Sequence, residues 1–190
     1  MQSYLGARHC FAPVKSLEVR RHSDRTRPDE HLSAAGRALA EEVGRTRGPF
    51  ERVISSAATR AIETAESMGF SPEVSHEVWL DPVSTGQVPW PRTFNEYRIL
   101  IDSDSGVRLR ALEVRSELLT ILESLGRDRQ ALVVGHGGLS ELAVGTLSPA
   151  RELATLGGPC RCMEGAYLTF EDGKCVSAKV LRVPSERTRL

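Results

Sequence analysis

The sequence contains few cysteines and no pair of them at the spacing common in zinc sites. Four cysteines in 190 residues are too few for a disulfide scaffold, and none forms a Cys-x-x-Cys pair. We therefore expect reduced thiols, as in a cytoplasmic protein, and no metal site. Cys160 and Cys162 are separated by one residue, and a redox or metal-binding role for them is less favoured than an incidental arrangement.

The sequence also lacks a long apolar run and an excess of charge of either sign. No segment approaches the roughly 18 apolar residues that a membrane-spanning helix requires. Residues 1–15 lack the continuous apolar stretch of a secretory signal. The 25 basic and 25 acidic side chains cancel, so the overall field favours neither nucleic acid nor a membrane as partner. We expect a soluble, cytoplasmic protein in which any anion site is local.

A chain of 190 residues suits one medium-sized domain. We predict a leader at residues 1–15, either disordered or extended, a single domain at 16–183, and a tail at 184–190 that frays. Residues 81–108 form an insertion within this domain. Its part up to residue 104 is rich in Pro, Thr and Ser, which predicts irregular structure with at most one helical turn.

Strand and helix patterns alternate along the predicted domain. Apolar stretches predict strands at 16–21, 51–56, 73–80 and 131–134, and an Asp-Gly turn predicts a hairpin of 166–170 with 175–183. Helical patterns run from the cap Ser33 to Gly44, from a serine cap at Ser56 to Gly69, over 108–125, and from Leu139 to Leu147. The alternation predicts an α/β fold, a three-layer sandwich in which helices flank a mostly parallel central sheet, with the hairpin at one edge.

Three of the predicted strands deliver polar side chains to one edge of the sheet. Ligands of open α/β sheets bind where the carboxyl ends of strands meet helix N-termini. The residues expected there are Arg21, His22, the segment 56–60 that ends in Arg60, and His136 with Gly137 and Gly138. Two arginines and two histidines fit a dianionic phosphoryl group, because guanidinium donates paired hydrogen bonds to phosphate oxygens.

His22 is the candidate nucleophile of this set. A substantial fraction of imidazole is unprotonated at neutral pH, and a phosphohistidine can pass its phosphoryl group to water. Each residue taken alone also has an ordinary structural explanation: a surface charge for Arg21, a loop histidine for His22, a solvated helix residue for Arg60 and a turn for His136. The order of the segments along the chain is what favours the chemical interpretation.

In that order, the segments resemble the signatures of the histidine phosphatase (phosphoglycerate mutase-like) superfamily, in its small bacterial phosphatase branch. Residues 17–24 (LEVRRHSD) resemble its R-H-G strand and loop, 32–36 (LSAAG) the helix start that follows, 54–65 (ISSAATRAIETA) its S-S-P-x-x-R-A-x-x-T-A segment, and 132–138 (LVVGHGG) its V-x-H-G-G segment. Ser23 and Ala57 stand where the family has glycine and proline.

The resemblance implies a phosphoglycerate mutase-like fold and neither a metal nor an organic cofactor. It implies that His22 is phosphorylated and that Arg21, Arg60, His136 and Gly137 bind the phosphoryl group. The family also needs a carboxyl group to protonate the leaving oxygen. Asp81, at the predicted end of the third strand, is the first candidate and Glu77 the alternative. If neither serves, we expect a substrate whose leaving group has a low pKa.

We therefore predict a metal-independent phosphatase that hydrolyses a phosphomonoester or a phosphoprotein through a phosphohistidine intermediate on His22. The partner is then a phosphorylated small molecule or protein, selected by the 81–104 segment. A phosphohistidine protein phosphatase is one alternative, because Asp24 and the Leu-Asp-Pro of residues 80–82 resemble the small bacterial phosphohistidine phosphatases. A catalytically weak, phospholigand-binding regulatory protein is the other.

Overall fold

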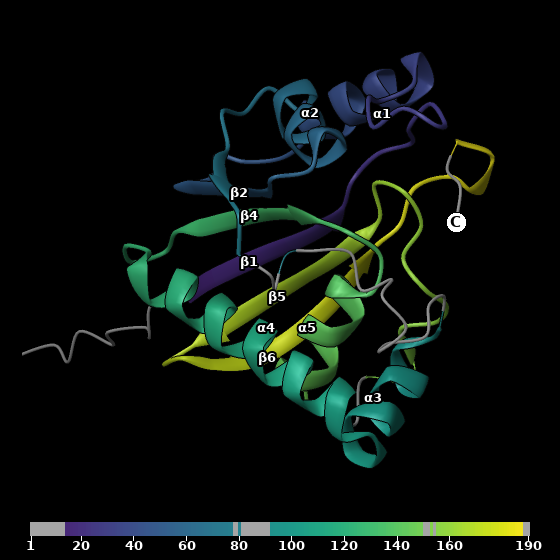
Figure 1. Ribbon diagram of the computed structural model, residues 1–190. Helices are drawn as coiled ribbons and strands as arrows, with labels where there is room; N and C mark the ends of the chain where they lie inside the picture. The colour runs from purple at the N-terminus through teal and green to yellow at the C-terminus, as the bar shows by residue number, and fades with distance from the viewer. Residues whose placement is uncertain (1–13, 78–79, 81–91, 150–152, 154, 188–190) are drawn as a thin grey trace, which may run out of the picture.

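The computed structural model describes residues 14–77, 80, 92–149, 153 and 155–187. These residues form a six-stranded sheet with helices on both faces (Figure 1). The strands are β1 (Val14–Arg21), β2 (Arg52–Ser56), β3 (Glu73–Ser75), β4 (Gln130–Gly135), β5 (Gly165–Glu171) and β6 (Lys174–Leu181). The helices are α1 (Ala34–Gly44), α2 (Thr59–Ser67), α3 (Phe94–Ser103), α4 (Ser105–Ser124) and α5 (Leu139–Leu147), and η3 (Ser185–Arg187) is a 3-10 turn.

The sheet has the strand order β3-β2-β4-β1-β5-β6. β1 and β2 both pair in parallel with β4, and β3 pairs in parallel with β2. β5 is antiparallel to β1, and β6 is antiparallel to β5. The predicted mostly parallel sheet with a hairpin at its edge is thus confirmed, and so is the α/β class.

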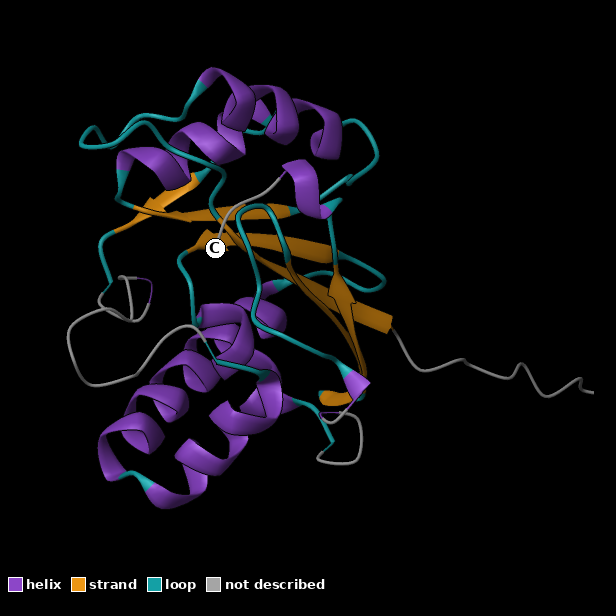
Figure 2. Cartoon of the chain, turned by 90° about the vertical axis from the view of Figure 1, so that its right-hand side faces the viewer, coloured by secondary structure: helices purple, strands orange, loops and turns teal. Residues whose placement is uncertain are grey.

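The sheet separates two helical layers. In Figure 2, which turns the molecule by 90°, α1 and α2 lie above the sheet and α3, α4 and α5 below it. The apolar run of β4 serves both layers: Ala131 and Val133 belong to the core under α3–α5, while Leu132 and Val134 belong to the core under α1 and α2. Alternating side chains of a strand point to opposite faces, so a central strand is apolar throughout. The three-layer sandwich is confirmed.

Two predicted elements differ from the structure. The third strand, predicted over 73–80, ends at Ser75, because β2 offers partners only from Ile54 to Ser56. The prediction of at most one helical turn before residue 104 is wrong for 94–103, where α3 forms ten residues of helix. Thr93 and Glu96 make a complete capping box at its start, and Phe94, Tyr97 and Ile101 bury one face.

The ends of the chain bear on the predicted boundaries. Residues 1–13 of the predicted leader lie outside the described residues, but Val14 and Lys15 belong to β1, where they pair with β5. In the predicted tail, Arg187 of η3 donates to Glu42 over 2.6 Å. Cys160 and Cys162 are buried, and Cys175 is half-buried. In the described part of the chain, no helix is long and apolar enough to cross a membrane.

Candidate active site

The register of the parallel strands brings the two predicted histidines together. Arg21, the last residue of β1, pairs with Gly135, the last residue of β4. One residue further, the His22 N–H donates to the Gly135 carbonyl over 2.8 Å. His22 and His136 therefore leave neighbouring strands at the same edge, and their ring centroids lie 5.3 Å apart in an edge-to-face arrangement.

The imidazole of His22 is held in one tautomer. Its Nδ1 lies 2.7 Å from the Ser23 carbonyl, which can only accept, so Nδ1 carries the proton. Its Nε2 accepts a hydrogen bond from Arg60 Nε over 3.1 Å. The pKa of His22 is lowered to about 3, mainly by burial and also by the charges of Arg21, Arg60 and Arg25, while the hydrogen bond to Ser23 opposes the shift. The ring is therefore neutral near pH 7, with a lone pair on Nε2.

The imidazole of His136 has the opposite arrangement. Its Nδ1 lies 3.1 Å from Arg60 Nη2, which can only donate. Its Nε2 therefore carries the proton and donates it to Ser56 Oγ over 2.8 Å. The pKa of His136 is lowered to about 2, mainly by burial and also by the neighbouring His22, Arg60, Arg21 and Arg25. Both imidazoles thus face one guanidinium through unprotonated nitrogens.

Arg60 occupies the centre of the site. It lies in the first turn of α2, and its side chain is 12% exposed. Nε contacts His22, Nη2 contacts His136, and Nη1 forms an ion pair with Glu30. Burial lowers its pKa, and the charges of Arg25 and Arg21 lower it further. Three guanidinium groups therefore lie near one another in a protein without net charge.

Arg21 is buried and braced by the segment that precedes β5. Its Nη1 donates to the Cys160 carbonyl over 3.3 Å, and its backbone N–H donates to the Glu164 carbonyl. The Met163 N–H donates to the carbonyl of His22. The structure thus brings together Arg21, His22, Arg60 and His136, as expected from the sequence.

Comparisons with known proteins place this arrangement in a known fold. No protein-family model and no curated protein matches the sequence. The protein histidine phosphatase SixA, complexed with tungstate, has a TM-score of 0.55 and 17% identity over 86% of this chain and 96% of its own. A mycobacterial glucosyl-3-phosphoglycerate phosphatase has a TM-score of 0.51 and 19% identity over 90% of this chain and 96% of its own. TTHB049 of Thermus thermophilus has a TM-score of 0.53 and 20% identity over 87% of this chain and 99% of its own. The chain has the histidine phosphatase fold.

Ser23, which stands where the signature that the sequence resembles has glycine, does not adopt a glycine conformation, since it is not among the residues with positive φ. It is fully buried, its N–H donates to Thr64 Oγ1 over 2.9 Å, and its hydroxyl donates to the Gly36 carbonyl over 2.7 Å. The serine therefore ties the loop after β1 to both α1 and α2. Gly138, in contrast, has a φ of 92° at the start of α5, where a side chain would be strained.

Of the two candidate acids, the structure describes only Glu77. Glu77 is exposed beyond the end of β3, where its N–H donates to Ser75 Oγ. Asp81 lies outside the described residues. Gly137 is half-buried in the turn between His136 and α5. The assignment of the acid, and of Gly137 to the phosphoryl group, stays a prediction.

Sequence reasoning assigned the wrong role to Ser56 and missed two further residues of the site, Arg25 and Glu30. Ser56 was expected to cap α2, but the N-cap is Ala58, and the serine hydroxyl instead contacts His136. Arg25 and Glu30 come from the loop after β1, whose many charges resemble an ordinary solvated loop. The available signal was the position of Arg25, three residues beyond His22 in the same loop.

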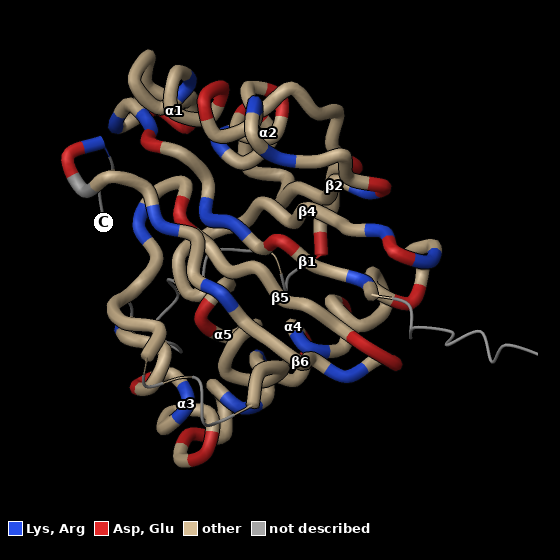
Figure 3. Tube along the Cα trace, turned by 180° about the vertical axis from the view of Figure 1, so that it is seen from behind, with Lys and Arg blue, Asp and Glu red and all other residues tan. Residues whose placement is uncertain are grey.

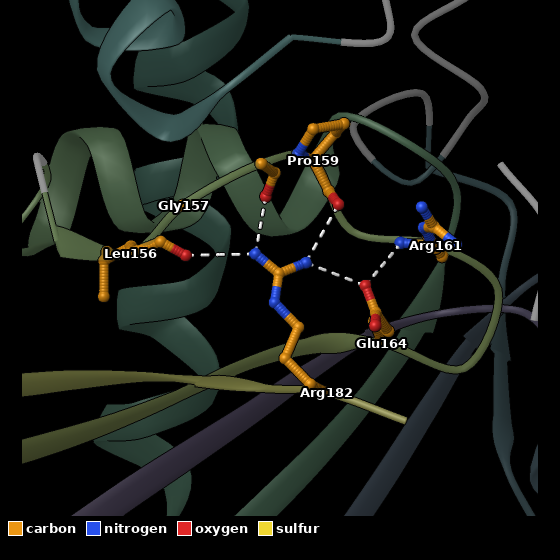
Figure 4. A pocket seen from close by; sticks show the side chains of 7 residues that line it. Leu156, Gly157, Pro159, Arg161, Glu164 and Arg182 are labelled. Atoms are coloured by element: carbon orange, nitrogen blue, oxygen red, sulfur yellow. Dashed lines mark hydrogen bonds and ion pairs between the residues drawn. The ribbon is translucent and has the colours of Figure 1, made fainter. Parts of the chain in front are cut away.

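A separate cavity of about 450 Å³ lies beside the segment that braces Arg21 (Figure 4). Arg182 points into it from the end of β6. Its Nη1 donates to the Pro159 carbonyl and to Glu164, and its Nη2 donates to the carbonyls of Leu156 and Gly158. Through these bonds Arg182 stabilises the loop of residues 156–164. Throughout the described residues, no three His, Cys, Asp or Glu side chains gather as metal ligands.

Proposed function

We propose that this protein is a phosphatase that forms a phosphohistidine on His22 Nε2. The observation that carries the proposal is the single guanidinium of Arg60 between two neutral imidazoles, 3.1 Å from His22 Nε2 and 3.1 Å from His136 Nδ1. The Ser23 carbonyl holds the proton of His22 on the other ring nitrogen. A neutral imidazole whose lone pair points to a cationic site is suited to attack phosphorus.

In the first step, His22 Nε2 attacks phosphorus in line and the bond from phosphorus to the leaving oxygen breaks. Arg60 transfers its hydrogen bonds from the imidazoles to the phosphoryl oxygens, and Arg21 and Arg25 add positive charge. The arriving negative charge raises the proton affinity of His136, which takes a proton from solvent, donates from Nδ1 to a phosphoryl oxygen, and returns the proton when phosphate leaves. The leaving oxygen takes a proton from a carboxyl group, for which Asp81 is the first candidate and Glu77 the alternative.

In the second step, water attacks the phosphorus of the phosphohistidine and the phosphorus–nitrogen bond breaks. The same carboxyl group, now ionised, takes the proton from the water, so that phosphate and neutral His22 are released. No step requires a metal ion, because the arginines neutralise the phosphoryl charge.

The substrate class is a phosphomonoester or a phosphoprotein. A small-molecule substrate is supported by the glucosyl-3-phosphoglycerate phosphatase among the structural neighbours. A phosphohistidine protein is the second candidate, because another neighbour is a protein histidine phosphatase. A phosphorylated histidine is a good leaving group and would not need a strong acid in the enzyme.

The experiment is a phosphoenzyme trap in the presence of a chelator. Wild-type protein and the His22→Ala variant are incubated with p-nitrophenyl phosphate and, separately, with a histidine-phosphorylated protein, and are quenched at alkaline pH. We expect phosphate release and a phosphoryl adduct on His22 in the wild type only. Near-normal turnover in His22→Ala would refute the mechanism, and phosphate binding without any adduct would favour a regulatory, phospholigand-binding protein.

A further inference from the structure

The phosphoryl site already contains an anion supplied by the protein itself. One carboxylate oxygen of Glu30 forms an ion pair with Arg60 Nη1. The other lies 2.5 Å from Arg25 Nη1. The same carboxylate therefore bridges two of the three guanidinium groups near His22 and His136.

The loop that carries Glu30 is anchored at both sides of the site. Arg25 and Leu32 form a β-bridge across it. Glu63 of α2 accepts from the Leu32 N–H over 2.8 Å and contacts His31 Nδ1 over 2.6 Å. Glu63 lies one helical turn after Arg60, so α2 holds both the loop and the guanidinium at the centre of the site. The position of Glu30 is therefore built into the structure.

A carboxylate and a phosphoryl group compete for the same donors. Both present oxygens in a geometry that matches the guanidinium fork. A phosphoryl group that accepts from Arg25 Nη1 displaces the carboxylate from that donor, and on Arg60 its charge at Nε and Nη2 competes with the carboxylate at Nη1 for the same guanidinium. The side chain of Glu30 is 47% exposed, so it has room to move away. Displacement of the carboxylate thus leaves the site open without unfolding the loop.

We propose that Glu30 is an internal competitor of the phosphoryl group and sets the affinity of the site for phosphorylated ligands. The proposal rests on the proposed function, since it assigns the same site to phosphoryl groups. A ligand that binds only the open site has an apparent affinity reduced by the fraction of molecules in which the site is open. The reduction applies equally to substrate and to inorganic phosphate. Glu30 therefore weakens inhibition by the phosphate product at the expense of substrate affinity.

The test measures binding by calorimetry, without turnover. The ligands are inorganic phosphate at pH 8, which is mostly a dianion, and dimethyl phosphate, a monoanion. The proteins are the wild type, Glu30→Gln, Glu30→Ala and the control Asp29→Asn. Asp29 carries the same charge one position away and is exposed, and within the described residues its carboxylate forms no ion pair.

We expect both Glu30 variants to bind phosphate about tenfold more tightly than the wild type. This factor corresponds to the lower end of the free-energy range for a hydrogen bond to a charged group, because the Glu30 side chain is half-exposed. Dimethyl phosphate should gain by the same factor, and Asp29→Asn should change either affinity by less than about twofold. Equal gains for a monoanion and a dianion are specific to a competitor, because a change in the long-range field acts in proportion to the ligand charge.

Three results would overturn the proposal while leaving the function intact. Unchanged phosphate affinity in both Glu30 variants would exclude competition. Weaker binding would mean that Glu30 orients the arginines. A loss of kcat that grows with the leaving-group pKa, at unchanged phosphate affinity, would make Glu30 the general acid. A wild type that binds no phosphate at all would instead refute the proposed function.

Discussion

The imidazoles of His22 and His136 differ in which nitrogen carries the proton, and a different neighbour decides this in each case. For His22 the neighbour is a backbone carbonyl, which no side-chain substitution removes. For His136 it is the guanidinium of Arg60, which can only donate to Nδ1 and so leaves the proton on Nε2. The nucleophile is thus oriented by the main chain, whereas its partner depends on one side chain.

At Arg60, substitution should affect turnover far more than folding. Arg60→Ala removes the group that contacts both imidazoles, and loss of one such charge-stabilising donor costs about 100- to 1000-fold in kcat. We expect the free energy of unfolding to change by only about 1 kcal/mol. Phosphate release and urea melts measure the two effects. Arg45→Ala, which removes an exposed arginine outside the site, serves as the control and should leave kcat unchanged.

The hydroxyl of Ser56 gives a second prediction at this scale. Ser56→Ala removes the acceptor of the His136 Nε2 proton, so the Nε2 signal of His136 should shift. The tautomer of His136 should stay the same, because Arg60 still donates to its Nδ1, and His22 should be unaffected. Histidine side-chain nitrogen shifts in NMR spectra report the tautomers directly. Loss of this buried bond should also lower the free energy of unfolding by about 1 kcal/mol. An unchanged His136 spectrum would contradict the assigned bond.

At the scale of elements, the loop after β1 is pressed against α1. A Cβ atom added at Gly36 would lie 2.1 Å from the backbone oxygen of Asp24. The loop that carries Arg25 and Glu30 can therefore approach α1 only because this helical position has no side chain. The resemblance of residues 32–36 to a family signature has a steric explanation in this contact.

Gly36→Ala should reverse the usual effect of this substitution in a helix. Alanine normally stabilises a helix by up to about 1 kcal/mol over glycine, but here the backbone must move, so we expect a loss of about 1–3 kcal/mol and weaker phosphate binding. The matched control is Gly106→Ala in the first turn of α4, where the added atom meets only a side-chain oxygen at 3.4 Å. Thermal melts of both variants should shift in opposite directions.

At the scale of the whole molecule, charges of both signs are interspersed along the trace (Figure 3), and the concentration of guanidinium groups beside two neutral histidines is a local exception. Because the pKa values of His22 and His136 are lowered, mainly by burial, to about 3 and about 2, the folded protein does not bind the protons that the unfolded chain binds below about pH 6.5.

Stability should therefore fall as the pH drops from about 6.5 towards 3, by roughly 1.4 kcal/mol per pH unit for each of the two imidazoles. Urea melts between pH 7 and pH 4.5 measure this slope. We expect His136→Asn to reduce it, since one buried imidazole is gone, and the control His76→Asn, at an exposed position, to leave it unchanged. Equal slopes in all three proteins would contradict the burial of a neutral His136.

Much of the fold could be predicted from local patterns. The apolar run of β4, the cap Ser33 and the stripe that α4 buries at Ala111, Val114 and Leu118 all depend on neighbours in the chain. The exceptions are informative. β3 is short because β2 ends, which no local pattern reveals, while α3 had a capping box in its sequence that composition alone obscured.

The sequence by itself determined the α/β layers, the histidines at the strand ends and the arginine of α2, because periodicity and strand polarity are local properties. Only the tertiary structure decided which nitrogens are free, that Ser56 contacts His136, and that Glu30 lies on Arg60. Those contacts join residues 30 to 80 positions apart in the chain. The parallel register of β1, β2 and β4 and the folding of one loop create them, and neither is encoded in any single segment.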